Sequence, residues 1–184
     1  YGIGGFGWNA YDFVDFLASC KQHYWQILPL TTTSYGDSPY QSFSARAGNP
    51  NFIDFAELIE AGYLEQRDID GVYLGSDPSN VDYGAIFGGR RQILDRAAER
   101  FAADKPADFD GFIQANEDWL IPYCEFMTVK EESGLKAFWE WPAELRTRGE
   151  ASAKVCADHP ARMLYHQMTQ YFFDRQWSRL KAYA

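Results

Sequence analysis

The feature that most constrains the fold is a short apolar run, YWQILPL at residues 24–30, which leads directly into a polar loop. The run is short, continuously apolar and carries Pro29 near its end, which is typical of a strand buried on both faces. Before it, Asn9 is a plausible N-cap, and apolar residues recur at helical spacing to about Gln22. A helix, a buried strand and a polar loop predict an α/β layout with a parallel strand.

The rest of the chain is dominated by helical patterns. We expect helices at 54–62, at 83–103, after a cap at Asp108 or Asp110, at 117–132, from Pro142, and at 159–184, with a loop over 70–82. One strand and about six helices do not make a balanced α/β domain. A buried strand needs neighbours for its backbone groups, so we expect the chain to be part of something larger.

Composition and charge exclude several classes of function. A content of 46 % hydrophobic and 17 % aromatic residues excludes a disordered chain. The net charge of −9, with no basic patch, argues against a nucleic-acid partner. No apolar run approaches membrane-spanning length and the N-terminus lacks signal-peptide features, so we expect no membrane partner.

The cysteines, histidines and glycines point to no metal or nucleotide. Three widely separated cysteines favour reduced thiols in a cytoplasmic protein over a disulfide framework. The three histidines are not spaced with acidic partners as metal ligands. The GIGGFG stretch at residues 2–7 satisfies GxGxxG, but only Tyr1 precedes it, so a flexible loop is favoured over a dinucleotide site.

The loop YGDSPYQS, residues 35–42, is the strongest candidate site. If residues 24–30 form a parallel strand, this loop begins at the carboxyl end of the strand, the face that carries active sites in β/α barrels. Aromatic rings can lie against the C–H faces of sugars while polar groups bind hydroxyls. The candidate residues are Tyr35, Asp37, Ser38, Tyr40 and Gln41.

Other interpretations of these residues remain open. Either tyrosine could pack beneath the loop, and Asp37 could be a local capping group. Ser38 lacks a GxSxG context and precedes Pro39, which favours a hydrogen-bonding role over a nucleophile. Most of the other carboxylates lie in mixed-charge runs typical of solvated helix faces.

At the level of whole segments, the chain resembles the start of the 4-α-glucanotransferase family, also called amylomaltase or disproportionating enzyme. The most specific pieces are YWQILPL and YGDSPYQSFSARAGNP, and WLIPYCEFMTVKE, FWEWPAELRTR and YFFDRQWSRLKAYA follow in the family's order. The resemblance spans essentially the whole chain.

The resemblance implies an α-amylase-like (β/α)8 TIM barrel with helical insertions, so that this chain itself is mostly helical. It makes 1–184 the incomplete N-terminal part of one catalytic barrel domain. Within it, 1–52 holds the first helix, the strand and the sugar-binding loop, about 53–158 is a mainly helical insertion, and 159–184 is a long barrel helix. It implies transfer of α-1,4-glucan segments between maltodextrins, with no cofactor. The mechanism is retaining, through an Asp nucleophile, a Glu acid and base, and a second Asp.

The family's three catalytic carboxylates lie on later barrel strands, so none is carried onto a position of this chain, and we expect the chain alone to be inactive. Tyr40, with Ser38 and Gln41, matches the loop that contacts glucan. Tyr35 matches a further glucan contact, and Asp37 is implied by adjacency. A stand-alone glucan-binding module and a helical structural domain are the rival interpretations, and the oligomeric state stays open.

Overall fold

The computed structural model describes residues 1–34 and 36–184, and the described part is mostly helical. The central element is α8 (Pro160–Tyr183). It contacts α1 (Trp8–Ser19), α4 (Tyr83–Ala103), α5 (Phe109–Ala115), α6 (Glu117–Glu132) and α7 (Glu150–Asp158). The shorter elements are α2 (Phe55–Glu60), α3 (Gln66–Asp70), η1 (Pro50–Phe52), η2 (Phe138–Glu140) and η3 (Ala143–Leu145).

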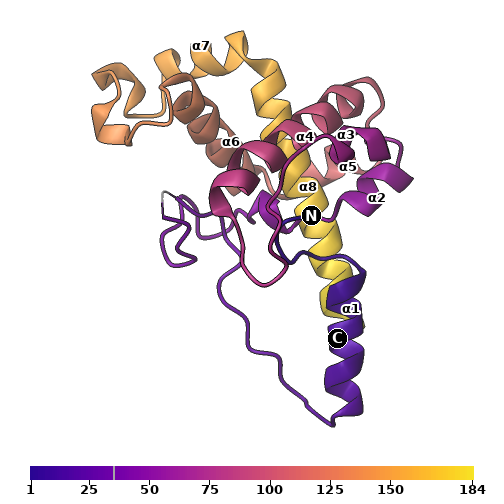
Figure 1. Cartoon of the computed structure of the whole chain (residues 1–184). Helices are drawn as coiled ribbons and strands as arrows, with labels where there is room; N and C mark the ends of the chain where they lie inside the picture. The colour runs from indigo at the N-terminus through magenta and orange to yellow at the C-terminus, as the bar shows by residue number, and fades with distance from the viewer. Residues whose placement is uncertain (35) are drawn as a thin grey trace.

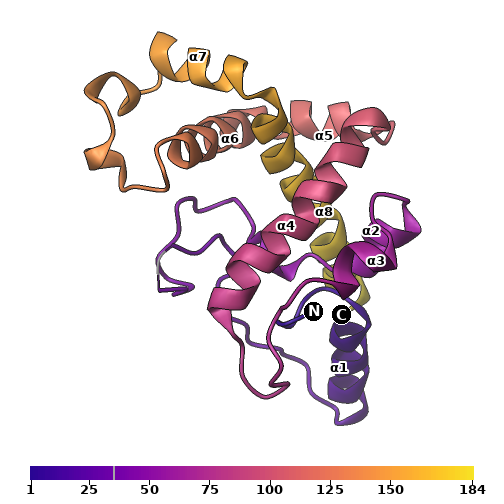
Figure 2. The same cartoon turned by 45° about the horizontal axis from the view of Figure 1, so that its top comes forward.

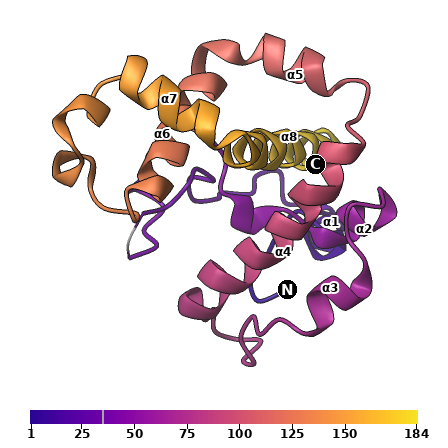
Figure 3. The same ribbon diagram turned by 90° about the horizontal axis from the view of Figure 1, so that it is seen from above.

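The helices are distributed along the length of α8. The α6 and α7 helices gather near its N-terminal end, and α1 runs beside its C-terminal half (Figure 1, Figure 2). The rings of Tyr11 in α1 and Tyr183 in α8, with centroids 5.0 Å apart, hold α1 beside α8. Viewed from above, α4 and α5 lie around α8 (Figure 3).

Local capping explains several helix ends that the sequence predicts. Asp54 Oδ1 accepts a hydrogen bond from Ala56 N at the start of α2, and Gly62, just beyond the end of α2, has a φ of 81°. Asp82 caps α4 through Ala85 N at 2.9 Å. The predicted helices at 83–103 and 117–132 are confirmed, whereas the stretch after Pro142 forms only the short η3.

An aromatic cluster holds α4 and α5 against α8. Phe101 of α4 lies 4.9 Å from Phe109 and 5.8 Å from Phe172, both edge to face. Tyr171 closes the cluster over Phe109 at 5.5 Å. Edge-to-face pairs add about 0.5–1.5 kcal/mol each to the burial of their area, so these rings stabilise the packing of α4 and α5 on α8.

The prediction of a buried strand at residues 24–30 is wrong: in the structure these residues are not part of a strand. Residues 24–29 form no backbone hydrogen bond to another described segment, and Tyr24 is 93 % exposed. Only at Leu30 does pairing begin, where its carbonyl accepts from Asn49 N at 2.9 Å. The apolar pattern marks a segment suited to a sheet, but a strand requires adjacent strands, and no described segment supplies them.

The same region exposes an apolar surface. Phe13 of α1 lies 5.0 Å from Trp25 and 6.1 Å from Phe16, and all three rings are exposed. Ile27 and Leu28 extend this surface along the segment that follows α1. Contiguous exposed apolar surface of this kind marks an interface.

Two adjacent glycines in α4 are expected to respond oppositely to alanine. A Cβ at Gly88 meets nothing within 4 Å, so Gly88→Ala should raise the free energy of unfolding by about 0.5–1 kcal/mol through helix propensity. A Cβ at Gly89 would lie 2.7 Å from Leu74 Cδ2 and 2.9 Å from the backbone oxygen of Tyr73, so Gly89→Ala should lower it by about 1–3 kcal/mol. Urea unfolding of both variants tests this pair, and equal effects would contradict it.

Candidate functional site

The loop that carries the candidate residues is anchored at its base by α8. Gln170 Oε1 accepts from Gly48 N at 2.7 Å, and its Nε2 donates to Gly48 O at 2.9 Å. Gly48 also packs so closely on Phe173 that a Cβ would meet the ring at 2.3 Å. Thr31 forms an isolated antiparallel bridge with Gly48. A buried amide and a glycine therefore fix where the loop leaves and rejoins the helical body.

Within the loop, hydrogen bonds close two tight turns. Ser34 N donates to Gln41 O at 3.1 Å, and Asp37 N donates to Ser34 O at 3.0 Å. Ser38 accepts twice, through its carbonyl from Gln41 N at 3.1 Å and through Oγ from Tyr40 N at 3.3 Å. Asp37 adopts a φ of 55°, a left-handed conformation that aspartate tolerates better than most residues. The loop therefore has a defined shape without forming helix or strand.

These turns present polar and aromatic groups together. The side chain of Tyr40 is 76 % exposed, so it does not pack beneath the loop. Gln41 is exposed, and Asp37 and Ser38 are half-buried beside it. The structure brings these four predicted residues into one short surface segment. Tyr35, the fifth, lies outside the described residues.

On its inner side the loop rests on α6. Phe43 lies 6.1 Å from Phe126, and Nζ of Lys130 lies 4.8 Å above the Phe43 ring. Burial lowers the pKa of Lys130. The sequence did not single out Phe43 or Lys130, because helix periodicity predicts a buried face but not which distant loop covers it.

A concavity of about 240 Å³ opens at the base of the loop. Its lining includes Thr31 and Arg46 from the loop, Trp119 at the start of α6, and Asp174 and Trp177 from α8. Burial raises the pKa of Asp174. The concavity combines aromatic rings, a carboxylate and a guanidinium, which suits a polar ligand with apolar faces. The sequence does not single out Trp119 or Trp177, because the concavity joins segments that lie far apart in the chain.

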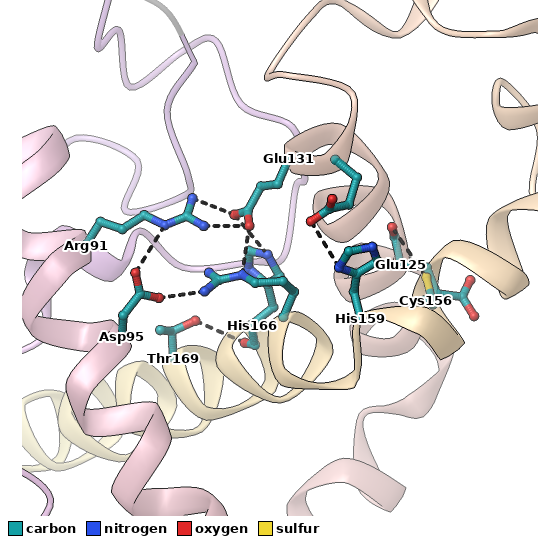
Figure 4. Close-up of polar contacts among 10 residues, drawn as sticks. Arg91, Asp95, Glu125, Glu131, Cys156, His159, His166 and Thr169 are labelled. Atoms are coloured by element: carbon teal, nitrogen blue, oxygen red, sulfur yellow. Dashed lines mark hydrogen bonds and ion pairs between the residues drawn. The ribbon is translucent and has the colours of Figure 1, made fainter.

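A second cluster of titratable groups joins α4, α6 and α8 (Figure 4). Glu131, 8 % exposed, accepts from Arg91 at 2.8 and 2.6 Å and from Arg162 Nε at 2.9 Å. Asp95 accepts from Arg162 NH1 at 2.6 Å, and His166 Nε2 lies 3.2 Å from Glu131 Oε1. Every charge in this cluster has a partner of opposite sign, so its chemistry is that of a structural support for the three helices.

The pKa values in the cluster have clear causes. Burial alone would raise the pKa of Glu131, but the contact with His166 and the guanidinium groups of Arg91 and Arg162 outweigh it and lower the pKa to about 2. Burial lowers the pKa of His166 below 6.5 despite the neighbouring carboxylate. The folded chain therefore carries an ionised Glu131 and a neutral His166 at neutral pH.

These shifts predict a specific loss of stability in acid. Between pH 6.5 and the lowered pKa of His166, the unfolded chain binds a proton that the folded chain does not, so the free energy of unfolding falls as pH decreases. Glu131 adds a second loss of stability as the pH falls below 4.5, the ordinary pKa of a glutamate, and this loss is complete only near pH 2, the pKa of Glu131 in the folded chain. Urea unfolding at pH 7.5, 6.5 and 5.5 should show the free energy of unfolding falling with pH, and His166→Gln should make that fall less steep. An unchanged slope in that variant would contradict the assignment.

Among residues 1–34 and 36–184, no group of three or more His, Cys, Asp or Glu side chains is placed to hold a metal ion. In the same described part of the chain, no helix is both long and apolar enough to cross a bilayer.

Comparison with known proteins assigns the family. A family model described as 4-alpha-glucanotransferase matches residues 1–184. The 4-alpha-glucanotransferase of Streptococcus pneumoniae strain TIGR4 is 52 % identical over 187 residues, and that of Thermus thermophilus is 39 % identical over 189 residues. Each match covers 100 % of this chain and 37 % of the relative, so the chain spans little more than a third of their length.

A solved structure agrees. Amylomaltase from Streptococcus agalactiae in complex with acarbose superposes with a TM-score of 0.92 at 46 % identity, over 99 % of this chain and 37 % of that one. The match between its fold and the helical arrangement around α8 extends over nearly all residues. On these grounds the chain belongs to the 4-alpha-glucanotransferase family.

Proposed function

We propose that this chain is the N-terminal part of an enzyme that transfers α-1,4-glucan segments between maltodextrins. The observation that carries the proposal is the exposed ring of Tyr40 beside Ser38, Asp37 and Gln41, on a loop whose base is clamped by Gln170. The amylomaltase relative holds acarbose, which supports an oligosaccharide as the ligand of this loop. Tyr35 belongs to the proposed site on the resemblance alone.

In the proposed mechanism, this chain binds glucan and the rest of the protein cleaves it. A nucleophilic Asp displaces one part of the donor to form a covalent glycosyl-enzyme, and a Glu protonates the departing oxygen. The same Glu then removes the proton from the acceptor hydroxyl, whose oxygen attacks the anomeric carbon; the bond to the Asp breaks, the Asp carboxylate is released and an α-1,4 bond is restored. The role of Tyr40 is to hold a sugar face, while Ser38, Asp37 and Gln41 orient hydroxyls. No cofactor is needed for this sequence of steps.

We further propose that residues 24–30 form the first strand of a (β/α)8 barrel in the complete protein, meaning this chain with the remainder of a family-length sequence. Its exposed apolar side chains, with Phe13 and Phe16 of α1, suit burial against further strands. On this scheme, 1–52 holds the strand and the sugar-binding loop, about 53–158 is an insertion, and 159–184 is a barrel helix. Cysteines without disulfides support a cytoplasmic location.

Glucose release from maltotriose tests the proposed function. The complete protein should disproportionate maltotriose into glucose and longer maltodextrins, whereas the 184-residue chain alone should release none, because the three carboxylates are proposed to lie elsewhere. A complete protein without this activity would contradict the function. Activity of the purified chain alone would contradict the division of roles.

A further inference from the structure

A turn outside the proposed loop presents two exposed aromatic rings. We call residues 134–141, between α6 and η3, the aromatic turn. Phe138 is 48 % exposed and Trp139 is 66 % exposed, and their rings meet edge to face at 5.5 Å. The turn lies in the orange segment that projects beyond α6 in Figures 1 and 3.

The backbone of the aromatic turn is held firmly from beneath. Nζ of the buried Lys130 donates to Leu135 O at 3.1 Å and to Lys136 O at 2.9 Å. The indole of Trp141, only 3 % exposed, donates to Lys136 O at 3.0 Å. Glu140 Oε2 accepts from Ala137 N at 3.1 Å. The two outward rings therefore sit on a turn with little freedom to move.

Two features of the aromatic turn lower the stability of the folded chain. Burying Lys130 removes an ammonium from water, and Leu135 is held at a φ of 61°, which costs about 1 kcal/mol or more for a non-glycine residue. Large exposed rings on a rigid support are typical of recognition surfaces, because little conformational entropy is lost when a ligand binds. The aromatic turn is thus built to present Phe138 and Trp139 outward.

The aromatic turn and the proposed glucan loop share one support. Lys130, which holds the turn, lies over Phe43 of the loop at 4.8 Å. Phe43 lies 6.1 Å from Phe126, and Phe126 lies 5.3 Å from Trp141 of the turn. The two surfaces are therefore connected through contiguous side chains. Figures 1 and 2 show the turn at the opposite side of the molecule from Ala184, where the chain ends.

We propose that the aromatic turn is an accessory contact for long α-glucan chains, with Trp139 and Phe138 lying against the C–H faces of sugar units beyond those held at the loop. The inference rests on the proposed function for the class of ligand. It assigns the turn a role in chain-length preference, because the turn would bind sugar units beyond those held at the loop. Stacking of sugar on an indole is the chemistry that the exposed ring offers.

The test uses the complete protein and the variant Trp139→Ala. In native gels containing amylose, retardation should weaken, with the apparent Kd raised about five- to tenfold. KM for amylose should rise by a similar factor, while kcat and KM for maltotriose stay unchanged. Trp139→Tyr should restore binding because it keeps an aromatic face. Tyr73→Ala is the control, since Tyr73 is another exposed aromatic residue, 63 % exposed, and should behave as wild type.

The outcomes separate the two proposals. A protein that disproportionates maltotriose but binds amylose equally with and without Trp139 overturns the accessory contact alone. A protein with no transferase activity that still loses amylose retardation in Trp139→Ala overturns the proposed function alone. Equal increases of KM for amylose and maltotriose also overturn the accessory contact, because they indicate a general effect on the cleft.

Discussion

Replacing Glu131 by glutamine is expected to lower the free energy of unfolding by about 3 kcal/mol, near the lower end of the effect of breaking a buried ion pair. The carboxylate accepts from Arg91 and Arg162 and lies 3.2 Å from His166. Its loss leaves two guanidinium groups facing each other with only Asp95 between them. Both arginines retain partial access to water, which limits the penalty.

The adjacent residue supplies the control. Glu132 is 38 % exposed at its side chain and contacts only His159, at 3.3 Å, among the ion pairs of the described residues. Glu132→Gln should therefore change stability by less than about 1 kcal/mol, as for other exposed pairs. Urea unfolding of both variants at pH 7.5 measures the difference. Equal stability of the two variants would contradict a supporting role for the Glu131 cluster.

Gly48→Ala is expected to have the second largest effect, a loss of about 3 kcal/mol, at the upper end of the cost of overpacking. The added Cβ would meet three ring carbons of Phe173 at 2.3–2.4 Å. Relief requires the backbone to move away from Gln170, which would break the 2.7 and 2.9 Å hydrogen bonds at the base of the loop. The substitution should therefore also weaken binding of maltoheptaose by the complete protein.

Gly71→Ala is the matched control for Gly48→Ala. Gly71 is exposed just after α3, has a negative φ, and a Cβ there meets nothing within 4 Å. Thermal and urea unfolding of the two variants give the comparison. If Gly48→Ala is as stable as Gly71→Ala, the close packing of the loop base on α8 is not what holds the loop.

Periodic helices with clear caps could be predicted from the sequence, and elements without such signals could not. The helix at 83–103 has a capping aspartate, Asp82, and a long apolar face. The α7 helix at 150–158 could not be predicted in this way, because Gly149 precedes it without a capping side chain and the helix is only nine residues long. The segment at 24–30 was recognised as suited to a sheet, but its conformation depends on strands that the described residues do not provide.

Some residues of the candidate site could likewise be predicted from the sequence, and others could not. Tyr40, Ser38 and Gln41 could be selected because they adjoin one another in sequence and their types suit sugar binding. Gln170 could not, since its contact with Gly48 joins residues 122 positions apart. Lys130 reads in sequence as an ordinary charged residue near a helix end, and only the packing of Phe43 and the aromatic turn around it gives it a role.

Binding of maltoheptaose to the complete protein tests most directly the central claim, that the loop carrying Tyr40 holds α-glucan. Calorimetric titration should give a Kd about tenfold higher for Tyr40→Ala than for wild type. Tyr73→Ala, which removes another exposed tyrosine on a loop before α4, should match wild type. If Tyr40→Ala binds maltoheptaose as tightly as Tyr73→Ala does, the loop is not a glucan-binding surface.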